Sequence, residues 1–252
     1  MSFAVSADAY LAFMGRYSEP LAHAFLAYAA LPDGGRVLDV GCGPGVITHL
    51  LAARPKAGPV SAVDPSPSFV EATRARIPDA DVRQAAAESL PWDDDTFDAA
   101  LAGLVVHFMT DPVRGLREMG RVTRPGGIVA ASVWDHAGGG SPLSLFWQAA
   151  VEVDPAAPSE AALPGTSEGH LTSLATEAGL GDVESSALTV RVRFPSYDEW
   201  WAPYLLGVGP LGAYVSTLGP EHRQEIRDRC VALLPDPPFE QPATAWVIRA
   251  RA

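Results

Sequence analysis

Arg36-Val-Leu-Asp-Val-Gly-Cys-Gly-Pro-Gly45 is the stretch that decides the fold of this 252-residue chain. Its first half, Val37 to Val40, has the composition of a buried strand and leads directly into glycines at 41, 43 and 45. A helical run from Val46 to Ala53 follows at once. Glycines at such a bend let the backbone turn sharply and let a ligand approach main-chain atoms. The stretch therefore predicts a strand–loop–helix unit with a ligand at the helix start.

Asp39 within this strand limits the classes of ligand that the loop is expected to bind. A carboxylate beside the loop repels a pyrophosphate but attracts an ammonium or hydroxyl group. The dinucleotide pattern G-x-G-x-x-G also fails, because Val46 stands where the third glycine belongs. The alternatives are a plain strand-to-helix turn or a nicotinamide-type dinucleotide fold. We interpret the loop as built for a nucleoside ligand that carries positive charge.

The segment resembles motif I of the class I S-adenosylmethionine-dependent methyltransferases, whose usual form is close to V-L-D-x-G-C-G-x-G. The resemblance covers residues 10 to 135 and is to methyltransferase domains of the small-molecule or ubiquinone-biosynthesis-like type. It implies S-adenosylmethionine as cofactor and S-adenosylhomocysteine as product. It also implies cofactor contacts at Asp39, Gly41, Cys42, Gly43 and Gly45.

A second strand, Pro59 to Asp64, also ends in an acid and is followed by Pro65, Ser66 and a helix to about Arg76. An acidic side chain at this strand end accepts hydrogen bonds from both ribose hydroxyls in related folds. We expect Asp64 to bind the ribose, with Pro65 and Ser66 beside it. The alternative is that Asp64 is a helix N-cap or turn former.

A third segment departs from the family pattern. The family often reads G-D-A-E-x-L-P here, and its Asp reads the adenine. Aligned on Glu88-Ser-Leu-Pro91, that position is Ala86. Adenine recognition is then expected from main-chain groups near Ala86 and Ala87, helped by Glu88. The alternative for Glu88 is a solvated loop acid.

The fourth strand, Phe97 to Leu104, is followed by His107. Ligands of open parallel sheets bind outside the carboxyl ends of strands, so Leu104 is expected at the cofactor and His107 near the transferring methyl group. Histidine suits a general base because its pKa lies near working pH. His107 is the first candidate and His136, after a fifth strand at 128–134, the second. The alternative is a packing or capping histidine.

The whole chain is expected to be one Rossmann-like α/β domain with seven strands, a mostly parallel sheet, an antiparallel last strand and helices on both faces. Strands six and seven are predicted at Asp182 to Phe194 and Thr244 to Arg251. An N-terminal helical cap is expected at 7–31, broken near Gly15 and Pro20, and a cofactor-binding core at 34–135. Residues 195–242 would form a helical lid.

The cap and the lid are expected to complete the site. Met14-Gly-Arg-Tyr17 is similar to a segment that folds over the cofactor in related methyltransferases. This implies that Arg16 pairs with the cofactor carboxylate, and that Tyr17 lies at the substrate. The lid aromatics Trp200, Trp201 and Tyr204 are expected to face an apolar substrate. The alternatives are a surface arginine and aromatics that only seal the lid onto the core.

Composition restricts the partners. A net charge of −12 argues against nucleic acid or an anionic membrane as substrate. Two cysteines make no disulfide framework, no metal pattern is present, and no signal-like or membrane-length apolar run occurs, so a cytoplasmic location is expected. We expect a small-molecule methyltransferase working by in-line displacement, as a monomer or homodimer. A diverged cofactor-binding protein and a protein methyltransferase are the alternatives.

Overall fold

A computed structural model describes residues 7–252 and contains a seven-stranded sheet in the order β3-β2-β1-β4-β5-β7-β6. β7 runs antiparallel to both of its neighbours, whereas the pairs from β3 to β5 are parallel. The strands are β1 (Val37–Val40), β2 (Val60–Asp64), β3 (Asp81–Gln84), β4 (Phe97–Gly103), β5 (Thr123–Trp134), β6 (Gly181–Phe194) and β7 (Phe239–Arg251). The predicted Rossmann-like fold with an antiparallel last strand is confirmed.

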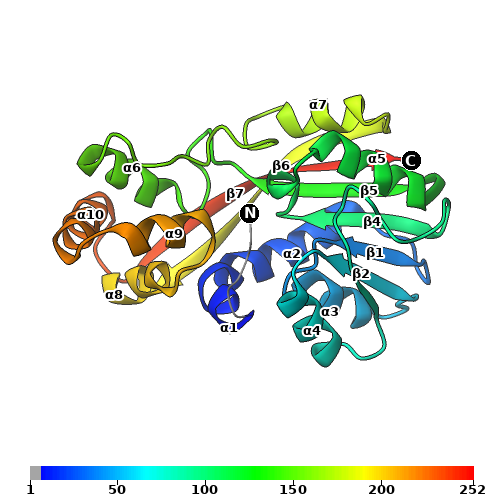
Figure 1. Cartoon of the computed structure of the whole chain (residues 1–252), viewed down its shortest axis with the longest axis horizontal. Coiled ribbons are helices and arrows are strands. Elements are labelled where there is room, and N and C mark those ends of the chain that lie inside the picture. Colours follow the sequence, from blue (N-terminus) through cyan, green and yellow to red (C-terminus); the bar gives the residue numbers. More distant parts are fainter. Residues whose placement is uncertain (1–6) are drawn as a thin grey trace.

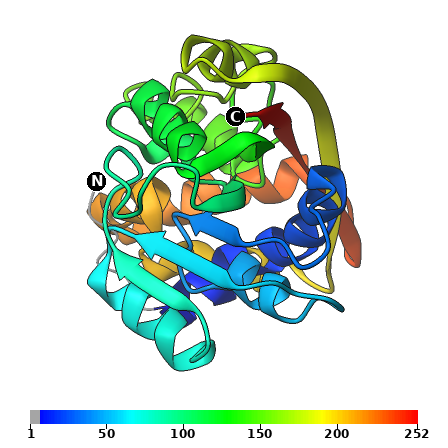
Figure 2. The same ribbon diagram turned by 90° about the vertical axis from the view of Figure 1, so that its right-hand side faces the viewer.

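Helices cover both faces of the sheet (Figures 1 and 2). In Figure 1 one set lies below the sheet: α2 (Arg16–Ala29), α3 (Val46–Ala52) and α4 (Pro67–Arg76). The other set lies above it: α5 (Pro112–Val122) and α7 (His170–Glu177). All four residues of β1 are buried, as expected for a central parallel strand. Val37 packs with Phe25 of α2, whereas Leu38 packs on the opposite face with Leu116 of α5.

The β6–β7 pair extends beyond the other strands. β5 pairs with β7 as far as Trp134 and Ala245, while β6 continues to pair with β7 as far as Phe194 and Phe239. In Figure 1 this extension runs into a cluster of helices. These are α6 (Ser144–Val153), α8 (Tyr197–Trp201), the 3-10 helix η3 (Ala202–Leu206), α9 (Gly209–Thr217) and α10 (Pro220–Leu233). The helical segment between β6 and β7 is therefore present, but residues 239–242 of the expected lid belong to β7.

The N-terminal helices differ from the predicted break. α1 (Ala7–Tyr10), a π-helical turn η1 (Leu11–Gly15) and α2 follow one another without a gap, and Pro20 lies inside α2. A π turn already interrupts the regular hydrogen-bond pattern of a helix. Pro20 lies near the start of α2. It has no N–H to donate within the helix, but the helix continues past it to Ala29.

Two further observations concern the residues from 7 onward. No helix among them has the length and apolar character needed to cross a membrane. Within the same range, no group of three or more His, Cys, Asp or Glu side chains is arranged to hold a metal ion.

Candidate functional site

Three adjoining pockets lie around the carboxyl ends of β1, β2, β4 and β5, and all three are lined by Tyr10 and Leu104. The central pocket has a volume of about 230 Å³ and includes Asp64 and the backbone near Ala86. The loop pocket, about 50 Å³, lies between α2 and the glycine loop and includes Asp39. The third, also about 50 Å³, includes His107 and is called the histidine pocket below. The shared residues make them one composite site.

Gly41 and Gly43 of the glycine loop differ in how much space surrounds them. Gly41 has φ +71°, and a Cβ atom there would lie 2.4 Å from Val105 Cγ2, so the loop packs tightly onto the segment after β4. Gly43 has φ +52°, and a Cβ atom there would meet nothing within 4 Å. Both backbones require glycine. Gly43 leaves open space on the side of the pockets, as expected where a ligand approaches the main chain.

Asp39 is buried beneath the loop. Its Oδ2 accepts a hydrogen bond of 2.6 Å from Thr48 Oγ1 on α3. Burial raises the pKa of the Asp39 carboxyl to about 7, although the bonds from Thr48 oppose this shift, and nearby Asp64 adds to it. A positively charged ligand group in the loop pocket would favour the ionised form of Asp39.

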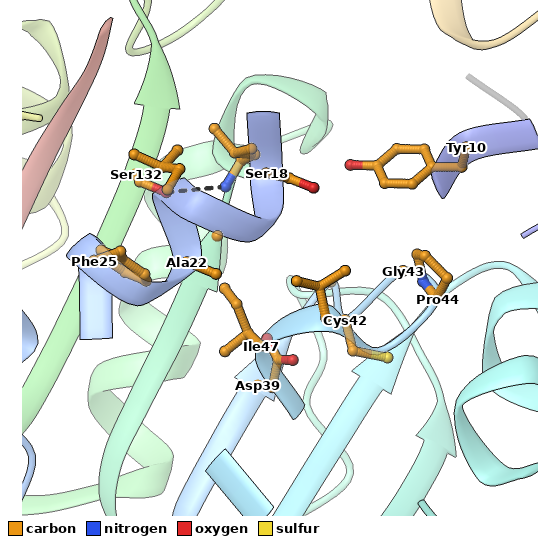
Figure 3. A pocket seen from close by; sticks show the side chains of 15 residues that line it. Tyr10, Ser18, Ala22, Phe25, Asp39, Cys42, Gly43, Pro44, Ile47 and Ser132 are labelled. Atoms are coloured by element: carbon orange, nitrogen blue, oxygen red, sulfur yellow. Dashed lines mark hydrogen bonds between the residues drawn. The ribbon is translucent and has the colours of Figure 1, made fainter. Parts of the chain in front are cut away.

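Figure 3 shows the loop pocket from nearby, with the hydroxyl groups of Tyr10 and Ser18 pointing toward one another beyond the loop. Ser18 Oγ is buried and has no hydrogen-bond partner among the described residues. Burial, with the nearby Asp64 carboxylate, raises the pKa of Tyr10 to about 12, so its hydroxyl is a donor at neutral pH. Neither Tyr10 nor Ser18 was among the site residues expected from the sequence.

Asp64 at the end of β2 is tied to the loop. Its Oδ2 accepts a bond of 2.9 Å from the Gly43 N–H, and its Oδ1 one of 2.8 Å from the Ser66 N–H. The carboxylate is buried, which raises its pKa despite these two bonds. Asp64 and Pro65 line the central pocket, whereas Ser66 lines none of the three pockets and contacts Asp64 through its N–H. A carboxylate keeps acceptor capacity beyond two hydrogen bonds.

The far end of the central pocket is lined by Ala86, Ala87 and Glu88. Glu88 Oε1 accepts hydrogen bonds from the N–H groups of Thr110 and Asp111, at 2.7 and 3.2 Å. The carboxylate thus anchors the loop that closes the pocket. Apolar walls come from residues that no sequence motif indicated: Phe69, Val105, Phe108 and Met109.

Leu104 lines all three pockets and has an unusual backbone conformation. Its φ is +59°, which few residues other than glycine adopt. Its N–H donates to the Ser132 carbonyl oxygen at 2.9 Å and lies 3.2 Å from Ser132 Oγ. Backbone strain of this kind persists where the surrounding structure holds it, most often at functional sites.

The histidine pocket brings the two candidate histidines together. The ring centroids of His107 and His136 are 5.7 Å apart. Burial lowers the pKa of His107 to about 3, helped by His136, and lowers that of His136 to about 4. Both imidazoles are therefore neutral at pH 7. At such a low pKa His107 is a weak base, which disfavours the general-base role expected from the sequence.

Comparisons with known proteins agree with this geometry. Residues 38–131 match the family described as a methyltransferase domain. An uncharacterised methyltransferase of Mycobacterium tuberculosis is 40% identical over 100 residues, which are 40% of each chain. The ubiquinone biosynthesis O-methyltransferase of Methylocella silvestris is 36% identical over 110 residues, 42% of each chain. The match thus spans less than half the length of these curated relatives.

A solved structure extends the likeness of the fold to most of the chain. The YcgJ protein of Bacillus subtilis superposes with a TM-score of 0.61 at 19% identity, covering 93% of this chain and 97% of that one. The matched part of the chain, residues 38–131, is thus a methyltransferase domain. The resemblance read from the glycine loop is confirmed.

Two groups of residues expected at the methyltransferase site lie elsewhere in the structure. Arg16 is exposed on the outer side of α2, with its guanidinium carbon 5.6 Å from the Phe194 ring centroid, and it lines a separate surface groove. The helical phase explains this, because Ser18 rather than Arg16 faces the loop pocket.

The aromatic residues of the lid and Tyr17 form a packed cluster. Trp200, Trp201 and Tyr204 are at most 8% exposed and line none of the three pockets. Tyr17 Oη donates a 2.8 Å hydrogen bond to Gln241 Oε1, and Trp200 Nε1 donates to the same oxygen. Their expected role at the substrate is thus replaced by packing of the lid onto the β6–β7 extension.

Proposed function

We propose that the domain binds S-adenosylmethionine across the loop and central pockets and transfers its methyl group to a small-molecule acceptor in the histidine pocket. One observation carries this proposal: the three pockets meet at Tyr10 and Leu104. A cofactor spanning the first two would thus present its reactive end to the third. The fold and the family support the methyl donor, and the pocket arrangement supports a small acceptor.

The residues present fit the cofactor. The open side of Gly43 admits close approach of a ligand, and the unpartnered Ser18 hydroxyl is available to a polar end group. Asp64 would accept bonds from the ribose hydroxyls, and Asp39 would balance the positive charge at the amino-acid end. The base would lie between Phe69 and the backbone at Ala86.

When bound, the cofactor supplies a methyl group on a positively charged sulfur, which is already a strong electrophile. The protein then has mainly to align the acceptor and exclude water. The small, buried histidine pocket favours one end of a small molecule over a folded protein surface. Among the described residues lining the three pockets, none is lysine or arginine, so nucleic acid is disfavoured as well.

Calorimetric titration with S-adenosylmethionine and S-adenosylhomocysteine tests the proposal. We expect micromolar binding of both, weakened at least tenfold by Asp64→Ala. Asp93→Ala is the matched control, because Asp93 is an exposed turn residue outside the pockets. Folded protein that binds neither compound would contradict the proposal.

A further inference from the structure

Polar groups are concentrated on one side of the histidine pocket. Besides His107 and His136, the pocket is lined by Trp134 at the end of β5 and by Glu160 from the loop between α6 and α7. All four side chains are at most 8% exposed. The rest of the lining is largely apolar, with Phe13, Met14, Leu143 and Val208 among its members. The Pro/Ala-rich segment between α6 and α7 thus places a buried acid at the pocket.

Several polar atoms of these groups lack hydrogen-bond partners among the described residues. His107 Nδ1, His136 Nδ1 and Trp134 Nε1 are buried nitrogens with no hydrogen bond to any described residue. Glu160 Oε2 accepts a 2.9 Å bond from Trp147 Nε1, and no described residue hydrogen-bonds its Oε1. Leaving a buried polar group unpaired costs about 1–3 kcal/mol, so several such groups around one pocket indicate a ligand that pairs with them.

The charge of the pocket excludes two kinds of ligand. Both imidazoles are neutral at pH 7, and no lysine or arginine is among the lining residues, so an acceptor carboxylate or phosphate would have no cation to pair with. A protonated amine could pair with Glu160, but in that form it has no lone pair to attack a methyl group.

A neutral amine fits less well than a hydroxyl because of Trp134. The indole N–H can only donate, so its partner must offer a lone pair. A neutral amine nitrogen has one lone pair, which the new bond would use. A hydroxyl oxygen has two: one can accept from Trp134 Nε1 while the other remains for the methyl group. Its O–H can donate to Glu160 Oε1 or to an imidazole nitrogen, and the group that accepts this hydrogen bond would take the proton when the oxygen gains the methyl group.

We propose that the histidine pocket receives the hydroxyl-bearing end of an uncharged acceptor, with Trp134 donating to the hydroxyl oxygen and Glu160 accepting from its hydrogen. This assignment rests on the proposed function, because it places the acceptor next to the cofactor pockets. The volume of about 50 Å³ limits the buried part to the hydroxyl and a few attached atoms. The remainder of the acceptor would extend past Leu104 or Val208.

The test uses four probes of similar size on protein saturated with S-adenosylhomocysteine: phenol, anisole, benzylamine and benzoate. Binding is measured by calorimetry or ligand-observed NMR. We expect phenol to bind at least fivefold more tightly than anisole, as the loss of one hydrogen bond of about 1 kcal/mol implies. Phenol that does not bind, or that binds no more tightly than any one of the other three probes, would overturn the proposal.

Two variants assign the preference to the named residues. Trp134→Phe removes the indole N–H and keeps a smaller aromatic ring, and Glu160→Leu removes the carboxylate; each is expected to reduce the phenol preference at least threefold. Glu168→Leu, an exposed acid of the same loop, is the control. Unchanged preference in both variants, with normal melting temperatures, would also overturn the proposal.

The two proposals fail in distinguishable ways. If S-adenosylhomocysteine does not bind the folded protein, the proposed function fails and the acceptor assignment fails with it. If S-adenosylhomocysteine binds and phenol is not preferred, the acceptor assignment alone is wrong.

Discussion

The Asp64 carboxylate accepts a hydrogen bond of 2.9 Å from the Gly43 N–H, 21 residues earlier in the chain. The acid at the end of β2 therefore fixes the glycine loop that follows β1. A residue proposed to hold the ribose is at the same time part of the scaffold of the loop. Substitutions of Asp64 are expected to affect cofactor affinity and loop stability together, and the two effects have to be separated.

Asp64→Asn separates them. The amide oxygen can still accept from the Gly43 N–H, but the charge and the second oxygen, which accepts from the Ser66 N–H, are lost. We expect the melting temperature to fall by a few degrees through the lost Ser66 bond, and S-adenosylmethionine affinity to fall by about tenfold or more, since hydrogen bonds to charged groups contribute about 1.5–3 kcal/mol. Thermal unfolding and calorimetry on the same sample measure both. An affinity within twofold of wild type would remove Asp64 from the ribose site.

Gly41→Ala and Gly43→Ala form a matched pair on the loop. Each places alanine at positive φ, which costs about 1–2 kcal/mol. A new Cβ at residue 41 also collides with Val105, whereas one at residue 43 points into open space. We expect Gly41→Ala to lower the melting temperature more, and Gly43→Ala to lose more cofactor affinity than its stability loss explains. The reverse order would mean that the ligand does not approach Gly43.

Ala86→Asp restores the acidic residue that related methyltransferases carry at the adenine. Ala86 is exposed at the end of the central pocket, so the longer side chain has room. One added hydrogen bond of about 1 kcal/mol corresponds to roughly fivefold tighter binding of S-adenosylmethionine. Ala57→Asp adds the same charge at an exposed site away from the pockets and should have no effect. Weaker binding in Ala86→Asp would argue against an adenine at this end of the pocket.

Cofactor affinity is expected to depend on pH through Asp39. Its pKa is raised to about 7, chiefly by burial, so the carboxyl is partly protonated near neutrality. A bound positive charge favours the ionised form, so binding near this pH releases a proton and becomes tighter as the pH rises.

The measurement is a series of titrations of S-adenosylmethionine between about pH 6 and pH 7.5. We expect severalfold tighter binding at the upper end, below the limit of tenfold per pH unit for one proton. Asp39→Asn has no charge to titrate and should give a flat profile. An equally steep profile in that variant would assign the dependence to another group.

The cofactor-binding half of the fold was predictable because its signals are local. The strand before Gly41 and the acids at two strand ends each lie within a few residues of sequence. Ser18 and Glu160 were missed because each reaches the site only through tertiary packing. Glu160 in particular lies in a Pro/Ala-rich loop, and a hydrogen bond from Trp147 Nε1 holds its carboxylate inward.

Arg16 and the lid aromatics show where local reasoning fails. The residue types suited their expected roles, but the direction of each side chain depends on helix phase and on neighbouring elements. Arg16 lies two positions from Ser18 and therefore faces away from the pocket. Aromatic residues between two strands are equally compatible with a substrate wall and with a packed cluster. Here β6 and β7 remain paired as far as Phe194 and Phe239, and the lid aromatics pack against this extension.

Trp200→Ala tests this last distinction directly. Trp200 is 2% exposed, its ring centroid lies 4.8 Å from that of Tyr204, and its Nε1 donates to Gln241 Oε1. Truncating a buried tryptophan costs about 3–5 kcal/mol, so we expect the melting temperature to fall by about 10 °C. Leu205→Ala, at a residue 51% exposed on the same segment, should change the melting temperature little.

Affinity provides the second readout for Trp200→Ala. Because Trp200 lines none of the three pockets, the folded variant should bind S-adenosylhomocysteine as tightly as wild type and should keep the preference for phenol over anisole. A variant with normal stability but without the phenol preference would return Trp200 to the acceptor site and contradict the packed-cluster interpretation. A variant with lower stability and unchanged affinities would assign this aromatic segment to packing the lid onto the β6–β7 extension.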